Sequence, residues 1–308
     1  MRLAAIDIGS NSIKVVVVDA ARSDSFDVLA SDRETVRLGQ ETLVDRHISE
    51  AAMQRAVACL KRFRSLAEAH YAEQIVAIAT AFLREADNAA AFIRVIERET
   101  GLRVDVLSGL EEARLIGLAA YHGCTEKGMT SLNIDIGGGS TEISIFRDNE
   151  PMMLHSIGMG AVGLTDRIIT SDPPGENELE QLRTAIRFSF ESCGNELLQR
   201  QRWDYTTATS GTAMTIGAAL NHTEPTTSTT ITLLQLERLN ATLARLTIAE
   251  RSSIVGIPPQ RADIIVAGAL ILEEMMRLLR VKSLRTCDWS LREGVIIDRL
   301  RAWERSGN

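Results

Sequence analysis

The 308-residue chain is poor in aromatic side chains and has no excess of positive charge. Phe, Trp and Tyr together make up 4% of the residues, which leaves few rings on which single-stranded nucleic acid could stack. The formal net charge is −7, from 34 basic and 41 acidic residues, and this balance argues against bulk nucleic-acid binding. We therefore expect no nucleic-acid partner, although a locally basic cleft could still hold an anionic ligand.

Cysteine is scarce, and long apolar runs are missing. The four cysteines form no C-x-x-C pair and have no histidine at metal-ligand spacing, so we expect four reduced thiols: Cys59, Cys124, Cys193 and Cys287. No apolar run reaches the roughly 18 residues that span a membrane. The first residues also lack the pattern of a signal peptide. We expect a cytoplasmic protein with no membrane partner.

The chain is longer than one compact core usually requires, so two domains are expected. Hydrophobic periodicity predicts the order β-β-β-α-β-α-β-α over the first 120 residues. From about residue 131 the chain restarts with strands and then alternates helices and strands. This repetition predicts an α/β fold of two similar domains, residues 1–121 and 122–308, with a ligand in the cleft between them. The last helix could pack back across the interface.

Local signals predict the ends of several elements. Ser49 is a typical N-cap for a helix that continues to about residue 70. Thr232, with Gln235 three residues later, predicts a capping box for another helix. The polar, β-branched stretch at residues 221–232 is expected to be a loop.

One short pattern occurs twice, as IDIGSNS at residues 6–12 and as IDIGGGSTE at residues 134–142. A strand ending in Asp-x-Gly, then small residues and a second strand, predicts a β-hairpin whose tip brings backbone N–H groups close to a ligand. Asp7 and Asp135 would end their strands and suit a Mg²⁺ ion carried by phosphates. Either copy alone could be an ordinary glycine-rich hairpin. Two copies in equivalent places favour two phosphate loops that face each other.

Other nucleotide-binding patterns are absent or out of context. The chain has no G-x-x-x-x-G-K-[ST] sequence, which excludes a P-loop. A G-x-G-x-x-G sequence at residues 158–163 follows a strand and precedes a helix. It is followed by a polar loop and a long helix rather than by the second parallel strand of a Rossmann unit. We expect it to be a structural or cleft-lining turn.

The two hairpins resemble the phosphate-1 and phosphate-2 motifs of the actin/Hsp70/sugar-kinase superfamily. More closely, the chain is similar to the exopolyphosphatase/guanosine-pentaphosphate phosphatase family over about residues 3–300. Beyond the hairpins, the similarity rests on ATAFLREADN, LSGLEEARLIGLAA, ATSGTAMTIGAA, RADIIVAGALIL and DWSLREGVIIDRL. The resemblance implies two duplicated actin-like ATPase (ribonuclease H-like) domains with a ligand cleft between them. The chain resembles the short form of the family, which lacks the C-terminal helical, HD-type region of longer members.

The resemblance also implies an activity, which is metal-dependent hydrolysis of the terminal phosphoanhydride of inorganic polyphosphate with release of orthophosphate. The expected cofactor is Mg²⁺, or Mn²⁺ in its place. Adjacent helical residues point about 100° apart, so only one of Glu111 and Glu112 can face a cleft. The family's general base matches Glu112, and Arg84 matches an arginine near the phosphate. The implied phosphate-binding residues are Ser10, Asn11, Ser12, Gly138, Gly139, Ser140, Thr141, Ser210, Gly211 and Thr212. The implied metal ligands are Asp7, Asp135 and Glu142.

Several alternatives remain open at this point. The same loops and glutamate would serve hydrolysis of guanosine pentaphosphate (pppGpp) at its 5′-phosphate. A polyphosphate or nucleotide phosphotransferase is a different class, and a non-catalytic sensor of (p)ppGpp or polyphosphate is disfavoured by the intact Glu112. A basic track from the cleft would favour a polymer, and its scattered candidates are Lys61, Arg114, Arg167 and Arg261. A homodimer is expected from the family alone.

Overall fold

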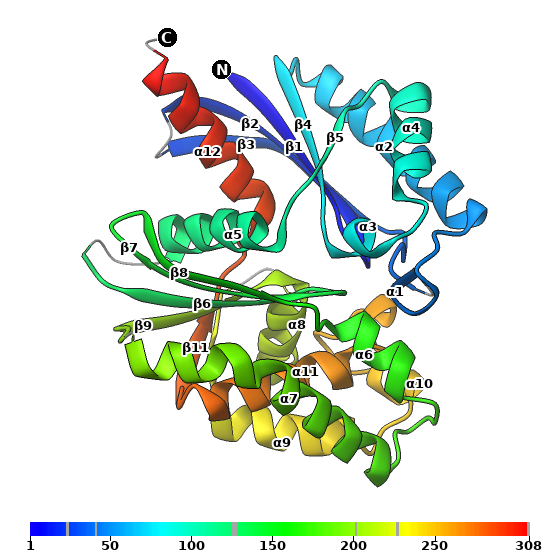
Figure 1. Ribbon diagram of the computed structural model, residues 1–308, viewed down its shortest axis with the longest axis vertical. Coiled ribbons are helices and arrows are strands. Elements are labelled where there is room, and N and C mark those ends of the chain that lie inside the picture. Colours follow the sequence, from blue (N-terminus) through cyan, green and yellow to red (C-terminus); the bar gives the residue numbers. More distant parts are fainter. Residues whose placement is uncertain (23–24, 41, 125–127, 201, 226–227, 307–308) are drawn as a thin grey trace.

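The computed structural model describes residues 1–308 except 23–24, 41, 125–127, 201, 226–227 and 307–308. It consists of two α/β halves, each built on one mixed sheet (Figure 1). The strand orders are β3-β2-β1-β4-β5 and β10-β11-β9-β6-β7-β8. Among the described residues, no helix is both long and apolar enough to cross a membrane.

In the first half, β1, β2 and β3 are antiparallel neighbours, and β4 and β5 continue the sheet in parallel. Its strands are β1 (Arg2–Ile8), β2 (Ser12–Arg22), β3 (Ser25–Thr35), β4 (Gln74–Ala79) and β5 (Val104–Val106). Its helices are α1 (Thr42–Asp45), α2 (Glu50–Ala69), α3 (Ala81–Glu85), α4 (Ala89–Thr100) and α5 (Gly109–Cys124).

The second half repeats this plan, with β6, β7, β8, β9 and β11 in the places of β1 to β5 and β10 added at the edge. Its strands are β6 (Ser131–Ile136), β7 (Thr141–Arg147), β8 (Glu150–Ile157), β9 (Tyr205–Thr209), β10 (Thr230–Thr232) and β11 (Ser283–Thr286). Its helices are α6 (Ala161–Ile168), α7 (Glu176–Arg200), α8 (Ser210–Asn221), α9 (Leu233–Leu243), α10 (Ile248–Arg251), the 3₁₀ turn η1 (Pro259–Arg261), α11 (Ile265–Leu278) and α12 (Leu291–Arg305).

The two halves exchange their last helices. Helix α5 follows β5 of the first sheet but packs against β7 and β8 of the second, whereas α12 follows β11 and packs against β1 and β2. The two helices also pack against each other, at the middle of the molecule in Figure 1. The expected domain boundary after residue 121 stays a prediction, because α5 precedes it and covers the other sheet.

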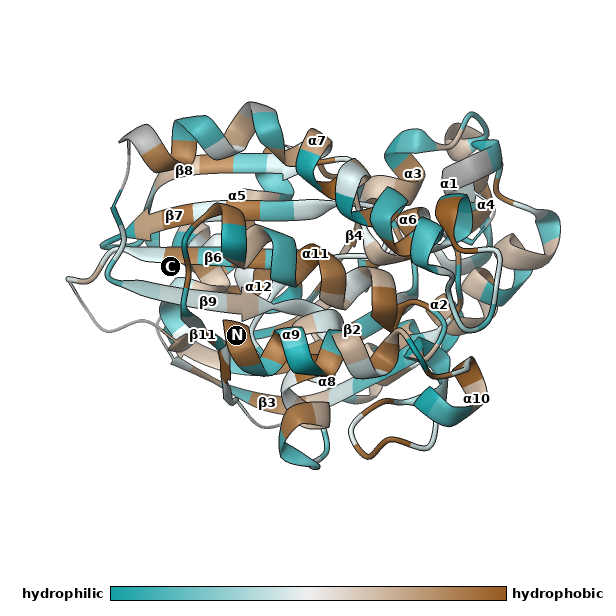
Figure 2. Ribbon diagram, turned by 90° about the horizontal axis from the view of Figure 1, so that it is seen from below, coloured by the Kyte–Doolittle hydropathy of each residue, from teal (hydrophilic) through white to brown (hydrophobic). Residues whose placement is uncertain are grey.

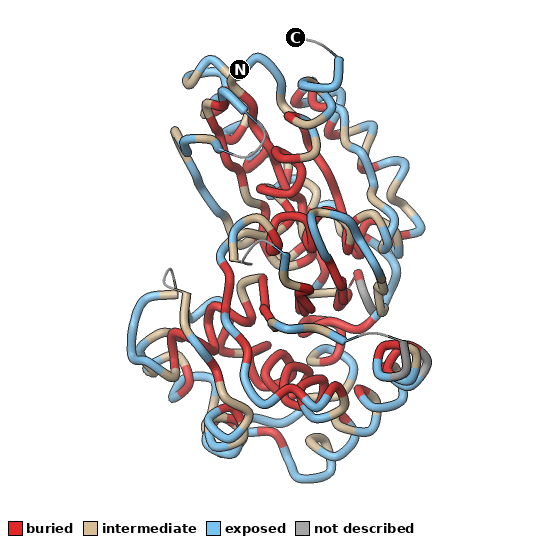
Figure 3. The backbone as a smooth tube through the Cα atoms, turned by 90° about the vertical axis from the view of Figure 1, so that its left-hand side faces the viewer, coloured by how far each residue is buried: buried red, intermediate tan, exposed pale blue. Residues whose placement is uncertain are grey.

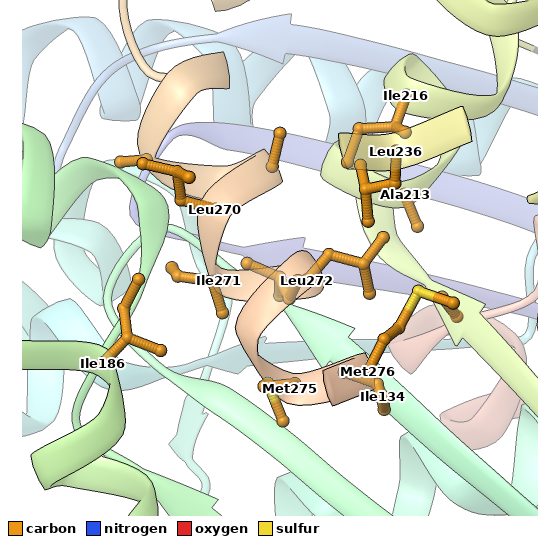
Figure 4. Close-up of a cluster of buried hydrophobic side chains, with 14 of the residues drawn as sticks. Ile134, Ile186, Ala213, Ile216, Leu236, Leu270, Ile271, Leu272, Met275 and Met276 are labelled. Carbon is orange, nitrogen blue, oxygen red and sulfur yellow. The ribbon is translucent and has the colours of Figure 1, made fainter. Parts of the chain in front are cut away.

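Helix α11 is the centre of the larger hydrophobic core. It is apolar on nearly every side and buried over most of its length, as expected for a helix surrounded by other elements (Figure 2). Its side chains meet β6, α7, α8 and α9 in a cluster that Figure 4 labels as Ile134, Ile186, Ala213, Ile216, Leu236, Leu270, Ile271, Leu272, Met275 and Met276. Buried segments also run through the first half and the junction (Figure 3).

Two of the predicted helix caps are confirmed, and one predicted loop is wrong in part. The N–H of Ala52 donates to Ser49 Oγ at 3.3 Å, and Thr232 and Gln235 form the predicted capping box. The stretch expected to be a loop contains β10, because its last residues pair with β11 at the sheet edge.

The expectation of four reduced thiols is also wrong for one pair. Cys124 at the end of α5 and Cys287 after β11 form a disulfide between positions 163 residues apart. Cys59 and Cys193 are free and buried. Sequence spacing could not indicate the pair, because the exchange of α5 between sheets is what brings Cys124 beside the end of β11.

The α5–α12 contact gives a stability test. A Cβ at Gly294 of α12 would overlap the backbone carbonyl of Leu115 on α5. Helix propensity alone predicts that Gly294→Ala stabilises the protein by about 1 kcal/mol. We expect a net loss of about 1–3 kcal/mol in unfolding free energy, measured in urea, because overpacking displaces the two helices. Gly158→Ala, in open space, is the control and should change stability by less than about 0.5 kcal/mol. A stabilised Gly294→Ala would contradict the packing.

Candidate active site

The two repeated motifs form hairpin turns of the same geometry. In the β1–β2 turn, the N–H of Gly9 donates to the carbonyl of Ser12 at 3.2 Å. In the β6–β7 turn, the N–H of Gly137 donates to the carbonyl of Ser140 at 2.9 Å. The repeated sequence is therefore a repeated backbone conformation.

The carbonyl groups at the hairpin tips are held by neighbouring segments. The carbonyl of Asn11 accepts from the N–H of Arg37 at 2.9 Å, and that of Gly138 accepts from the N–H of Val162 at 2.9 Å. The N–H groups of Asn11, Gly138 and Gly139 have no hydrogen-bond partner in the described part of the chain. Unpaired amides at a turn favour an anion.

The two tips meet at the junction of the halves. A Cβ on Gly138 would lie 2.9 Å from Cβ of Ser10 and 3.5 Å from the backbone nitrogen of Asn11. A Cβ on Gly160 would overlap the backbone of Gly138 and Gly139. Glycine is therefore required where the second hairpin touches both the first hairpin and the start of α6. The G-x-G-x-x-G turn is thus part of the cleft wall, as its context predicted.

A cavity of about 80 Å³ lies between the tips. The predicted residues that line it are Asp7, Ser10, Asn11, Ser12, Glu112, Asp135, Gly138, Gly139, Ser140, Ser210, Gly211 and Thr212. Four polar residues that the sequence prediction did not include among its site residues also line it, namely Lys14, Thr80, Arg261 and Ser290. Most of the predicted site is thus brought together by the fold.

Three predicted residues do not line the cavity. Arg84 reaches it only through Glu112, to whose Oε2 its Nη1 donates at 2.7 Å. Thr141 is fully buried, and its hydroxyl donates to the carbonyl of Met159 at 2.6 Å, so this hydroxyl is not free to bind a phosphate. Glu142 lies behind the cavity wall beside Asp135.

Glu112 is the carboxylate that α5 presents to the cavity. Its side chain is 8% exposed, whereas that of Glu111 is 40% exposed and pairs with Arg114 at 2.7 Å. Glu111 therefore lies nearer the surface than Glu112. Burial raises the pKa of Glu112 to about 7, against the lowering effect of Arg84. A carboxyl group with this pKa can exchange a proton near neutral pH.

The hairpins differ in the residue opposite the repeated aspartate. Asp7 faces Lys14 across β1–β2, and Lys14 Nζ lies 3.7 Å from Asp7 Oδ2. Asp135 faces Glu142 across β6–β7, so this pair brings two carboxyl groups together on one face of the sheet. Burial raises the pKa of Glu142 well above its usual value, and the neighbouring carboxylates of Glu112 and Asp135 add to the increase.

The donors around Asp135 and Glu142 fit a hard divalent cation. Asp135 Oδ2 accepts from Thr209 at 2.5 Å and from Ser290 at 3.0 Å. Glu142 Oε1 accepts from Ser156 at 2.8 Å, but its Oε2 is buried and has no hydrogen-bond partner within 3.5 Å among the described residues. No group of three or more His, Cys, Asp or Glu side chains among the described residues is placed to hold a metal directly. A Mg²⁺ ion, which usually keeps several waters, needs only one or two such carboxylates.

Arg261 supplies the main unpaired positive charge of the cavity. It is 6% exposed, forms no ion pair with the described residues, and its Nε is buried without a partner. Burial, with the nearby Arg33, lowers the pKa of Arg261 to about 9. Among the other candidates for a basic track, Lys61 and Arg114 pair with carboxylates and line no cavity near the site. A buried arginine left without a carboxylate favours a bound anion.

Comparisons with known proteins show the family of this chain. A family model described as the Ppx/GppA phosphatase family matches residues 15–302. The chain belongs to the Ppx/GppA phosphatase family. Exopolyphosphatase 1 of Mycobacterium leprae is 34% identical over 97% of this chain and 90% of that protein, and exopolyphosphatase 1 of Mycobacterium tuberculosis H37Rv is 33% identical over 97% and 88%.

Solved structures of the Ppx/GppA family share the whole fold. An exopolyphosphatase from Cytophaga hutchinsonii is 28% identical, with a TM-score of 0.91 over 98% of both chains. The Ppx/GppA family member of Aquifex aeolicus is 25% identical, with a TM-score of 0.82 over 98% of both chains. The predicted fold class, two duplicated actin-like domains, is confirmed.

Crowding of carboxyl groups at the second hairpin predicts an effect on stability. In metal-free protein at pH 8, we expect Glu142→Gln to raise the unfolding free energy by about 1–2 kcal/mol, because it removes a buried, repelled charge. The raised pKa of Glu142 in the folded state means that wild-type stability falls as pH rises above the unfolded value. The gain should therefore shrink toward acidic pH.

Thermal unfolding measures this effect, with exposed Glu180→Gln as a control that should change little. Mg²⁺ should raise the melting temperature of the wild type more than that of Glu142→Gln. A variant less stable than the wild type at pH 8 would rule out this account of Glu142.

Proposed function

We propose that this chain is an exopolyphosphatase, which hydrolyses the terminal phosphoanhydride of inorganic polyphosphate and releases orthophosphate. The proposal rests chiefly on one observation, the buried carboxyl group of Glu112 with a pKa of about 7 beside two facing amide-lined turns. The relatives named above are exopolyphosphatases, which supports the same substrate class.

In the proposed reaction, Glu112 accepts a proton from the water that attacks the terminal phosphorus. The oxygen bridging to the next phosphate leaves with the electrons of the broken P–O bond, and orthophosphate is the product. Arg84 holds Oε2 of Glu112 and leaves Oε1 for the water. Proton transfer to a placed carboxylate contributes about 10²–10⁴ to the rate of such reactions.

Phosphate oxygens are proposed to bind where the cavity offers unpaired donors. These donors are the tip amides of the two hairpins, the hydroxyl groups near them and the guanidinium of Arg261. Beside the two hairpins, the start of α8 also lines the cavity. Its first residue, Ser210, has a left-handed φ of 78°. A strained non-glycine residue in a cleft is common at functional sites. A guanidinium near the transferred group stabilises the charge that develops in the transition state.

The proposed cofactor is Mg²⁺, or Mn²⁺ in its place, held through Asp135 and Glu142. Asp7 is a weaker candidate for direct contact because Lys14 already offsets its charge. When bound, the cation neutralises phosphate charge and orients the phosphates. The assignment is supported by Oε2 of Glu142, which is buried and has no hydrogen-bond partner in the part of the chain that the structure describes.

Hydrolysis of pppGpp is the near alternative, because the same cavity would serve it. Phosphate transfer to ADP is a separate outcome of the same assays. A cytoplasmic location and a homodimer are further proposals that rest on the sequence and the family.

Glu112 can be tested against its own neighbour. Glu112→Gln should lower kcat for phosphate release from long-chain polyphosphate by about 10²–10⁴, because the amide cannot accept the proton. Glu111→Gln, one residue earlier on the same helix, should keep activity within about twofold, because its side chain pairs with Arg114 outside the cavity.

The assay measures orthophosphate from long-chain polyphosphate, tripolyphosphate and pppGpp in parallel, with Mg²⁺ or Mn²⁺. Absence of release from all three would refute the hydrolase. Full activity of Glu112→Gln would show that another group is the base. Faster transfer to ADP than to water would indicate a phosphotransferase.

Arg84 can be tested through the pH profile. The base acts when ionised, so kcat/KM should rise with pH through about 7. Removing the guanidinium in Arg84→Met takes away the charge that lowers the pKa of Glu112, and the rising limb should move up by about one pH unit or more. Exposed Arg98→Met should leave the limb in place. A lower rate with an unmoved limb would mean that Arg84 does not set the protonation of Glu112.

A further inference from the structure

A second cavity of about 400 Å³ adjoins the first. The two share part of their lining, including Lys14, Ser210 and Ser290, so one continues into the other. One wall of the second cavity is the face of the β2–β3 ribbon, and the opposite wall comes from α8 and the start of α12. None of the residues proposed above for water activation lines it.

A row of side chains leads from the first cavity into the second. Asp7 on β1 pairs in register with Lys14 on β2, and Lys14 pairs in register with Arg33 on β3. Residues directly opposite in antiparallel strands lie on the same face of the sheet. The row therefore runs across three strands from the carboxylate at the hairpin to an arginine at the sheet edge.

Three cations, Lys14, Arg33 and Arg292, line the second cavity, and three carboxylates, Asp7, Asp288 and Glu293, also line it. Burial and the charge of Arg292 lower the pKa of both Lys14 and Arg33, and the carboxylate of Asp7 opposes this effect. Arg292 pairs with Glu293 at 3.3 Å and donates to the carbonyl of Val15. Arg33 forms no ion pair with a carboxylate of the described residues. A guanidinium that lacks an ion pair among the described residues and lies near other cations favours an anion as its partner.

The two aromatic side chains in the wall of the second cavity contact each other. Phe26 and Trp289 stack on each other, with ring centroids 5.1 Å apart and planes 24° apart. This stacking takes one face of each ring and so reduces the ring surface open to a nucleobase. A linear anion that follows the cationic row fits the second cavity better than a nucleoside.

We infer that the second cavity binds the phosphates that follow the one being cleaved, with Arg33 as their contact at the sheet edge. This inference rests on the proposed exopolyphosphatase function and deepens it. The enzyme would hold a linear polyphosphate by its end in the first cavity and by its next units in the second. Arg33 would then distinguish long chains from short phosphates, without a part in the hydrolysis itself.

The test compares ligands of different length on catalytically inactive protein. In the Glu112→Gln background, calorimetry measures the binding of long-chain polyphosphate, tripolyphosphate and pppGpp. We expect Arg33→Ala to weaken long-chain binding about tenfold and to change tripolyphosphate and pppGpp by less than about twofold. Arg33→Lys, which keeps the charge, should recover part of the loss. The control is Arg103→Ala, since the Arg103 side chain is 91% exposed and lines neither cavity.

The steady-state assay with active protein gives a second readout. Arg33→Ala should raise KM for long-chain polyphosphate and leave kcat unchanged. Equal losses for long and short ligands, or no loss at all, would overturn the inference, and a selective loss of pppGpp would assign the cavity to a nucleoside instead. If wild-type protein hydrolyses none of the three but Arg33→Ala still weakens only long-chain binding, the hydrolase proposal fails while the binding site stands.

Discussion

The whole site depends on the contact between two backbone turns across the junction of two sheets. Gly138 touches Ser10 of the facing hairpin, and Gly160 touches the backbone of Gly138 on its other side. Neighbouring segments hold the tip carbonyls, and the tip amides have no hydrogen-bond partner among the described residues, so they are free to bind an anion. The exchange of α5 and α12 serves this contact, since each half packs a helix on the sheet of the other.

The two hairpins share one backbone hydrogen-bond pattern and differ in charge. At equivalent positions, Lys14 faces Asp7 while Glu142 faces Asp135. The first hairpin is thereby close to electrically neutral, and the second concentrates carboxyl groups whose pKa values rise with burial and mutual repulsion. Such an arrangement costs stability without a cation, and natural proteins accept this cost mainly at functional sites.

The sequence predicted the parts that depend on local pattern, and missed those that depend on which elements meet. Both hairpins, the caps at Ser49 and Thr232 and the repeated strand order follow from short-range signals. The pairing of Cys124 with Cys287 depends on α5 crossing to the other sheet, which no local signal encodes. Arg114 pairs with Glu111 three residues earlier on the same helix, which is a local contact. The burial of Arg261 without an ion pair among the described residues depends on tertiary packing, which no local signal encodes. The presence of Lys14 at the site could have been predicted from the sequence, because the register of the expected β1–β2 hairpin places Lys14 opposite Asp7.

The ion pair between Arg84 and Glu112 joins the general base to the arrangement of the halves. Arg84 belongs to α3, in the first half, whereas Glu112 belongs to a helix that packs on the second sheet. Arg37 and Asp263 form a second bond across the same junction, at 2.7 Å. The pKa of Glu112 is the balance of burial, which raises it, and Arg84, which lowers it. Both effects require the halves to be in contact, so the protonation of the base is itself a property of the assembled cleft.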